Sequence, residues 1–349
     1  MRPRFFVLVI TAVGLFHTRG TWALAPGEGL ILNPSTGDYT LNYCDPDQLP
    51  DTCVIEQVIF TPATKLSPVL RTRFILNTAD WSITYRYRVK NKAASRQPLV
   101  MLALDPIPDI NAPIPLSKRL VDLKTAGVAT QLGAGRAVLL TPAGWQGTTV
   151  PSVQSPNFLR LGWTFGSLAF PQAGLAPGQV QLGFGFTSTN LPGIAIAAQL
   201  SGNPERTNSF DDDGPTGDIG AQFNALQLHD YVTSVAAVPT VAIPMPFGRA
   251  ELLRRIDAQM KTWVDLKLLD PTLLPQLDGY IQAAITAASV ADLTSCAADV
   301  ASVRNRLLQI YALLDDLPDE WTETADSPLI AKLAARVLYF DLGYAISHP

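Results

Sequence analysis

The sequence is poor in the side chains that most enzymes use for acid–base catalysis and for zinc binding. It holds only 3 histidines in 349 residues; His17 lies in the N-terminal segment and His348 is the penultimate residue. A Ser/His/Asp hydrolase would have to use His229, and no G-x-S-x-G nucleophile elbow accompanies it. Zinc sites of the usual His and Cys type lack ligands. We therefore interpret His229 as a surface or hydrogen-bonded histidine.

Long apolar runs are absent except at the N-terminus. There, Arg2 and Arg4 precede the apolar run Phe5–Phe16, and Ala23-Leu24-Ala25 gives a small-x-small cleavage pattern. This predicts a signal peptide that ends at Ala25, with cleavage after Ala23 as an alternative. A retained membrane anchor is the other interpretation, but the run is short of the roughly 20 apolar residues that a span needs. We expect a secreted chain without an integral membrane segment, placed outside the cell, at its surface or in the periplasm.

Charge is also scarce, at 16% of the residues. Loss of residues 1–25 removes Arg2, Arg4 and Arg19 but no acid, so the 26 basic and 30 acidic side chains become 23 and 30, a balance of −7. This balance disfavours nucleic acid and anionic membrane surfaces as partners.

There are 3 cysteines. Cys44 and Cys53 bracket the loop DPDQLPDT, and export would place them where disulfides persist. We predict a Cys44–Cys53 disulfide. A metal site is the alternative, but the loop lacks histidine, and two thiolates alone make a poor zinc site. We interpret Cys296 as a buried, small apolar residue.

The stretch WSITYRYRVKN, from Trp81 to Asn91, alternates strictly between two kinds of side chain. Because successive side chains of a strand point to opposite faces, this predicts a strand with one face in a core and the other in water. The core set is Ile83, Tyr85, Tyr87 and Val89, and the water-facing set is Thr84, Arg86, Arg88 and Lys90.

Similar short runs, separated by turn signals, fill residues 26–200. We expect a hairpin between Gly29–Asn33 and Tyr39–Tyr43. In the predicted strand Val180–Thr187, the glycines Gly183 and Gly185 indicate a bulge or the close approach of another backbone. Many short strands without helical patterns between them predict an antiparallel β-sandwich. The other predicted strands are Val54–Thr61, Leu70–Leu76, Pro98–Leu104, Leu159–Phe165 and Ile194–Leu200.

Two stretches resemble immunoglobulin-like domains of exported bacterial proteins. ITYRYRVKN followed by LVMLALDPIP resembles a strand pair of these domains, and GLAPGQVQLGFGFTSTNLPG resembles the closing hairpin of such domains in secreted proteins of unassigned role. The resemblance covers residues 28–200. It implies an Ig-like sandwich and carries no catalytic residue.

Residues 201–246 interrupt this pattern with a polar, acidic and proline-rich stretch, which predicts a linker. Within it, DDDGPTGD offers several carboxylates beside glycines, and calcium binds such oxygen ligands. We therefore consider a calcium site at Asp211, Asp212, Asp213 and Asp218, with a plain acidic linker as the alternative.

From residue 247 to 349 the apolar period becomes helical, with four amphipathic stripes that predict an antiparallel helical bundle. Ser289 with Asp292 resembles a capping box for the third helix, and Ser327-Pro328 is expected to open the fourth. The segment from Leu277 to Ile310 also resembles the FIMAH-type helical modules at the C-termini of bacterial surface proteins. The stripes include Leu252, Ile256, Met260 and Trp263; Leu277, Ile281 and Ile285; Val300, Val303 and Leu307; and Leu333, Val337 and Leu338.

Two further kinds of site deserve comparison. Paired carboxylates run glycosidases, and the candidate clusters are Asp211–Asp213 and Asp315–Asp326, which otherwise are solvated acidic stretches. Tryptophans bind sugars in carbohydrate-binding modules, but Trp81, Trp145, Trp163, Trp263 and Trp321 are mostly explained as core or loop anchors.

The sequence thus predicts an exported, non-enzymatic binding or structural protein of the cell envelope or extracellular space. The alternative is a secreted, glycosidase-like hydrolase that uses acidic residues. A protein or a surface glycan is the expected partner.

Overall fold

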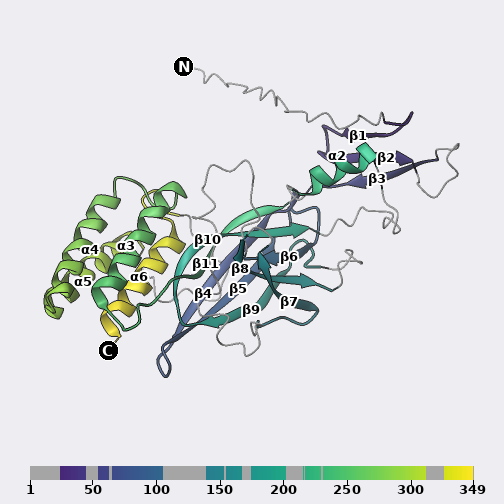
Figure 1. The fold of residues 1–349 in the computed structure, drawn as a ribbon. Helices are drawn as coiled ribbons and strands as arrows, with labels where there is room; N and C mark the ends of the chain where they lie inside the picture. The colour runs from purple at the N-terminus through teal and green to yellow at the C-terminus, as the bar shows by residue number, and fades with distance from the viewer. Residues whose placement is uncertain are drawn as a thin grey trace, which may run out of the picture. The chain divides into compact units, whose positions relative to one another are not determined.

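A computed structural model describes most of the chain (Figure 1). The described residues are 24–44, 54–62, 65–104, 139–152, 155–166, 174–201, 215, 217–228, 231–311 and 326–348. They form two compact units: unit 1 draws on residues 1–60 and 206–228, and unit 2 on residues 61–205 and 229–349.

Unit 1 is a small antiparallel sheet covered by one helix. Its strands are β1 (Gly29–Leu32), β2 (Tyr39–Cys44) and β3 (Ile55–Phe60), in the order β1-β2-β3, and its helix is α2 (Gly217–Leu228). The predicted hairpin is confirmed, because β1 pairs antiparallel with β2. The core of the unit is Leu41, Tyr43, Val58, Phe60, Ile219 and Phe223.

The described part of unit 2 contains two antiparallel sheets and four helices. One sheet has the order β4-β5-β9 and the other the order β11-β10-β6-β8-β7. The strands are β4 (Pro68–Asn77), β5 (Ser82–Asn91), β6 (Leu99–Ala103), β7 (Trp145–Ser152), β8 (Ser155–Phe165), β9 (Val180–Ser188), β10 (Leu191–Ser201) and β11 (Val232–Val241).

The alternation predicted for residues 81–91 is confirmed in β5. Ile83, Tyr85, Tyr87 and Val89 are buried in the main core, which they share with residues of the five-stranded sheet such as Trp163. The Tyr87 hydroxyl donates to the Ala237 carbonyl of β11 at 2.8 Å. The two sheets therefore meet through the inner face of β5, and its arginines lie on the outer face.

Consecutive described strands of unit 2 change sheets at three places: between β5 and β6, between β8 and β9, and between β9 and β10. The segments that resemble an immunoglobulin-like strand pair and closing hairpin contain the strands β5 and β6 and the strands β9 and β10. However, β5 is not hydrogen-bonded to β6, and β9 is not hydrogen-bonded to β10. β5 pairs with β4 and β9, whereas β10 pairs with β11 and β6.

A register shift in β9 changes the predicted face of its first half. Between the partners of Tyr87 and Val89 the pairing slips, and Gly183 there adopts φ +96°. Phe184 and Phe186 stay in the core as expected, but Leu182 is 53% exposed. The expected bulge is thus present, and it turns Leu182 outward. At Gly185 a Cβ would lie 2.2 Å from the Tyr85 carbonyl oxygen, so the predicted close backbone approach is confirmed.

The structure differs from the predicted linker over 201–246 at two places, α2 and β11. The central residues of β11, from Ala236 to Val238, are fully buried and show no alternation. β11 also contains Pro239. Because proline has no backbone N–H to donate to a neighbouring strand, it is found in edge strands rather than in central ones. β11 is an edge strand of its sheet.

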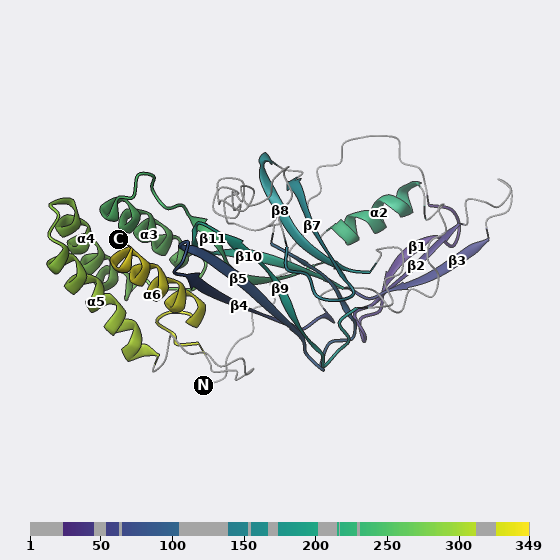
Figure 2. The same cartoon turned by 90° about the horizontal axis from the view of Figure 1, so that it is seen from below.

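The helices of unit 2 are α3 (Arg249–Asp265), α4 (Leu274–Ser289), α5 (Leu293–Ile310) and α6 (Lys332–Ser347). α3 contacts α4 and α6, and α5 contacts the same two helices. Figure 2 shows the four helices on one side of the two sheets. Among these helices, α6 contacts the strands β10 and β11. The predicted stripes on α3, α4 and α5 are buried.

Two predicted helix starts are wrong. Asp292 is itself the N-cap of α5 and accepts from the Ser295 amide at 3.0 Å, while the Ser289 hydroxyl donates back to Ile285 within α4. α6 begins at Lys332 rather than at Ser327, because Ala331 is extended and Ile330 forms a β-bridge with Leu269.

The ends of the helical segment are joined by one side chain. Arg249, at the start of α3, donates from Nε to the Ala345 carbonyl at 2.7 Å and from Nη2 to the His348 carbonyl at 2.8 Å. The His348 ring stacks on Phe247 at 4.2 Å and lies 4.5 Å from Trp81. None of the helices in the described ranges is both long and apolar enough to span a membrane.

Candidate functional site

The residues considered for calcium are mostly outside the described part of the chain. Asp211, Asp212 and Asp213 lie there, as does His229. Asp218 is described, and it lies in the first turn of α2, where a carboxylate interacts favourably with the helix dipole. Among the described residues, no three His, Cys, Asp or Glu side chains gather in a way that would hold a metal ion. The calcium site stays a prediction.

The cysteines fall in both units. Cys44 ends β2 opposite Ile55, and Cys53 lies outside the described residues, so their disulfide also stays a prediction. Cys296 is a free, buried thiol on α5, in agreement with its interpretation as a core residue. Burial raises the pKa of this thiol, which makes it a poor nucleophile.

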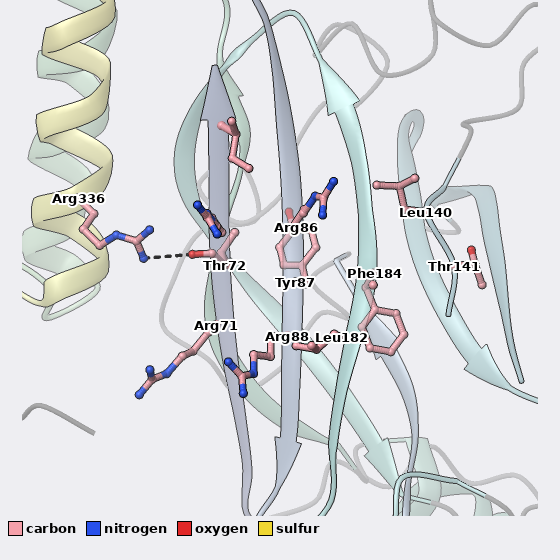
Figure 3. A pocket seen from close by; sticks show the side chains of 13 residues that line it. Arg71, Thr72, Arg86, Tyr87, Arg88, Leu140, Thr141, Leu182, Phe184 and Arg336 are labelled. Atoms are coloured by element: carbon pink, nitrogen blue, oxygen red, sulfur yellow. Dashed lines mark hydrogen bonds between the residues drawn. The ribbon is translucent and has the colours of Figure 1, made fainter. Parts of the chain in front are cut away.

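A cavity of about 470 Å³ opens on the outer face of the β4-β5-β9 sheet (Figure 3). Five arginines line it, four from β4 and β5 and one from α6. The sequence pattern assigned Arg86 and Arg88 to a water-facing surface and did not single out the other three. The arginines are Arg71, Arg73, Arg86, Arg88 and Arg336; we call them the arginine cluster.

The strand register places four of these arginines opposite one another. Arg71 pairs with Arg88 and Arg73 with Arg86 across the β4–β5 hairpin. Directly opposite residues have Cβ atoms about 5 Å apart, and residues two apart on a strand are about 7 Å apart. The register therefore gathers four positively charged side chains on one part of the outer sheet face.

Arg336 adds a fifth guanidinium from a different element. Its Nη1 donates to the Thr72 carbonyl at 3.2 Å, and the group lies 5.3 Å from the centre of the Phe74 ring. Burial, followed by the charges of Arg73 and Arg71, lowers the pKa of Arg336 to about 10. The side chain is therefore a cation at neutral pH, held in place by the sheet and partly stripped of water.

Lys332, one turn before Arg336 on α6, belongs to the same electropositive region. Burial lowers its pKa, and the charges of Arg71 and Arg336 lower it further, while Asp326 acts in the opposite direction. Positive charge thus extends from the sheet onto the start of α6.

The opposite wall of the cavity is apolar. It is formed by Leu182 of β9 and by Leu140, which Figure 3 shows across the sheet from Arg71 and Arg336. Phe184 also borders the cavity, but it is fully buried in the core. Leu140 is fixed by two hydrogen bonds to Gly185, of 2.7 and 3.1 Å, so it adds a short strand segment to the edge of β9. Its side chain is 40% exposed.

This chain matches no protein-family model, no curated protein and no solved structure.

The polar side of the cavity consists mainly of guanidinium donors. Its described lining contains no carboxylate, histidine or cysteine, and its other polar groups are Thr72, Thr141 and Tyr87. The Tyr87 hydroxyl is engaged with Ala237, and burial raises its pKa well above 10. Arginine stays protonated at all ordinary pH values and serves poorly as a general base. The arrangement suits recognition of an anion.

A second cavity, of about 400 Å³, has two carboxylates in its lining, Asp270 and Asp326. Both perform local structural tasks. Asp270 accepts from the amide and hydroxyl of Thr272, which lowers its pKa, and Asp326 accepts from the Lys332 amide at 2.8 Å. A glycosidase needs one carboxyl whose pKa is raised, and Asp270 has the opposite shift.

One carboxyl with a raised pKa lies away from both cavities. Asp341 of α6 is 1% exposed, burial raises its pKa, and its Oδ1 has no hydrogen-bond partner among the described residues. It is close enough to raise the pKa of the Tyr85 phenol. Asp341 lines none of the cavities described above, so we assign it to the core.

The arginine cluster was visible in the sequence as two R-x-R pairs, RTR at 71–73 and RYR at 86–88. Joining them requires the recognition that the two strands form one hairpin, with four residues from Thr78 to Trp81 between them. The contribution of Arg336 carries no such local signal.

Proposed function

We propose that this chain is an exported, non-enzymatic binding protein that holds an anionic ligand on its arginine cluster. In this proposal the two sheets of unit 2 are an Ig-like β-sandwich and its four helices a bundle. The cavity on the outer sheet face is the binding site, and the expected setting is the cell surface, the extracellular space or the periplasm.

The observation that carries the proposal is the arginine cluster in one cavity. A protein with a net negative charge does not gather five guanidinium groups by general composition. Two strands bring four of them into register, and α6 supplies the fifth through a hydrogen bond to β4. Guanidinium groups bind carboxylate, sulfate and phosphate through paired N–H donors, and the volume lies in the range typical of ligand sites.

Burial of Arg336 supports the same proposal, because it removes part of the hydration of this guanidinium group and lowers its pKa. An anion in the cavity would offset this effect. A ligand that binds only the folded state stabilises it by about 2.7 kcal/mol at a hundredfold excess over its dissociation constant.

The glycosidase-like alternative has no comparable support in the described residues. The arginine-lined cavity lacks carboxylates, and the carboxylates of the second cavity are occupied with backbone and hydroxyl donors.

The test is binding of multivalent anions to the purified chain. Citrate, inorganic sulfate and pyrophosphate should each raise the melting temperature at constant ionic strength. The double variant Arg73→Gln with Arg86→Gln should abolish this shift. Both side chains are exposed, so the variant should fold.

The matched control is Arg254→Gln with Arg306→Gln, which removes the same charge from α3, where Arg254 is exposed, and from α5, where Arg306 is half-exposed. It should keep the shift. If the control loses the shift as fully as the cluster variant, the effect is one of net charge and the proposal is wrong.

A further inference from the structure

The two walls of the arginine-lined cavity differ in chemistry, and this difference limits the ligand. The guanidinium groups come from β4, β5 and α6, whereas Leu182 comes from β9 and Leu140 from the segment added to its edge (Figure 3). A small, fully hydrated anion would use the first wall and leave the second in contact with water.

The apolar wall is exposed because the backbone makes it so. The shift at Gly183 turns Leu182 out of the core, where the alternation of β9 would otherwise place it. Leu182 is 53% and Leu140 40% exposed, and Ile75 of β4 lies in the same lining. Apolar side chains that share a concave surface with charged groups are typical of a ligand pocket.

A long polyanion fits this surface less well. Such a ligand gains affinity by pairing many of its charges with cations along its length. Here the arginines of β4 and β5 form only two opposed pairs, two residues apart along the strands. On the β9 side the cavity is lined by leucines rather than by cations.

Resting on the anion-binding function above, we propose that the ligand is a single-chain amphiphile with an anionic head. The head, a carboxylate, sulfate or phosphate, lies against the arginine cluster, and the apolar body lies along Leu140 and Leu182. The cavity takes the amphiphile as a monomer from solution.

The experiment compares three compounds by calorimetry on the purified chain, each below its micelle concentration. Octyl sulfate has both parts, ethyl sulfate has only the head, and octyl glucoside has the chain with a neutral head. We expect octyl sulfate to bind at least tenfold tighter than either of the others. Leu182→Ser should reduce octyl sulfate binding about tenfold and leave ethyl sulfate unchanged.

Leu293→Ser is the matched control, because Leu293 is a leucine of similar exposure, 54%, on α5. It should bind octyl sulfate like the parent chain. Arg73→Gln with Arg86→Gln should lose both sulfates.

The outcomes separate the two proposals. Equal affinity for ethyl and octyl sulfate overturns the amphiphile and leaves anion binding in place. Octyl glucoside binding as tightly as octyl sulfate overturns both, and so does the absence of binding by all three. Vesicles of anionic phospholipid are the last arm; if the chain sediments with them and ignores monomeric octyl sulfate, uptake from solution is wrong.

Discussion

The phenol of Tyr87 donates a 2.8 Å hydrogen bond to the carbonyl of Ala237, and these two residues are 150 positions apart. The bond joins β5 of one sheet to β11 of the other. The Ala237 amide in turn donates to the Thr72 hydroxyl of β4 at 3.2 Å. One residue of β11 is thus held by both long strands of the β4–β5 hairpin.

Tyr87→Phe should lower the free energy of unfolding by about 1 kcal/mol, the usual net value of a buried hydrogen bond. The ring stays in the core, so the loss reports the hydroxyl alone. Urea unfolding measures it, with Tyr280→Phe on the half-exposed surface of α4 as the control. Equal stability of the Tyr87 variant and the parent chain would contradict a bond between the sheets.

Ala236→Asp separates a strand from a linker. In β11 the side chain is fully buried, and an uncompensated buried charge costs about 3–5 kcal/mol. Thr233→Asp, on the exposed part of the same strand, should cost less than about 1 kcal/mol. If both variants melt with the parent chain, residues 232–241 are the connector that the sequence pattern predicted.

The strand β11 shows how a sequence pattern can fail to predict a strand. β5 was predictable because one of its faces meets water, so its polar and apolar residues alternate. The middle of β11 consists of small apolar residues that are all buried, and the strand contains Pro239. It therefore shows neither alternation nor the composition of a central strand. Its role depends on edge position and on Thr72 and Tyr87, which no local pattern reveals.

The site shows a different limit. The arginines of β4 and β5 were readable as polar faces, and only the hairpin register brings Arg71 beside Arg88. The outward position of Leu182 depends on the backbone conformation at Gly183, and that of Arg336 on the packing of α6. Those features follow from tertiary structure, so the sequence alone indicated a solvent-facing surface.

Asp341→Asn should stabilise the protein at neutral pH. Burial raises the pKa of Asp341 in the folded state, so the folded protein holds this proton more tightly than the unfolded chain does. Its contribution is complete below the unfolded pKa of about 3.9 and is lost as pH rises toward the folded pKa. Because one pKa unit corresponds to about 1.4 kcal/mol, we expect a gain above about 1 kcal/mol at pH 7 and almost none at pH 4.

Urea unfolding between pH 4 and pH 8 measures this gain. Asp299→Asn on α5 is the control for removal of a carboxylate that is not fully buried. A constant difference between the Asp341 variant and the parent would mean that the carboxyl does not titrate differently on folding.

The predicted Cys44–Cys53 disulfide should appear in a non-reduced peptide map, with Cys296 alkylated only after unfolding. Closure of so short a loop stabilises by roughly 2–3 kcal/mol in the chain-entropy model. Reduction should therefore lower the melting temperature of unit 1. A peptide that links Cys296 to either of the others would refute the pairing.

The acidic stretch around Asp211 is tested by melting curves with calcium and with chelator. If calcium binds the folded form, its addition should raise the melting temperature by several degrees, since a hundredfold excess over the dissociation constant is worth about 2.7 kcal/mol. Asp211→Asn with Asp213→Asn should remove the rise. Superimposable curves at millimolar calcium would identify the stretch as plain linker.

The clasp of Arg249 on Ala345 and His348 sets an order in time. Its more distant acceptor is 99 residues further along the chain, so at roughly 5–20 residues per second the ribosome adds it about 5–20 s after Arg249. During that interval α3 is complete in sequence, but its first turn has no clasp and Phe247 has no ring to stack on. The helical segment, whose individual helices form locally, closes only when its two ends have both been synthesised.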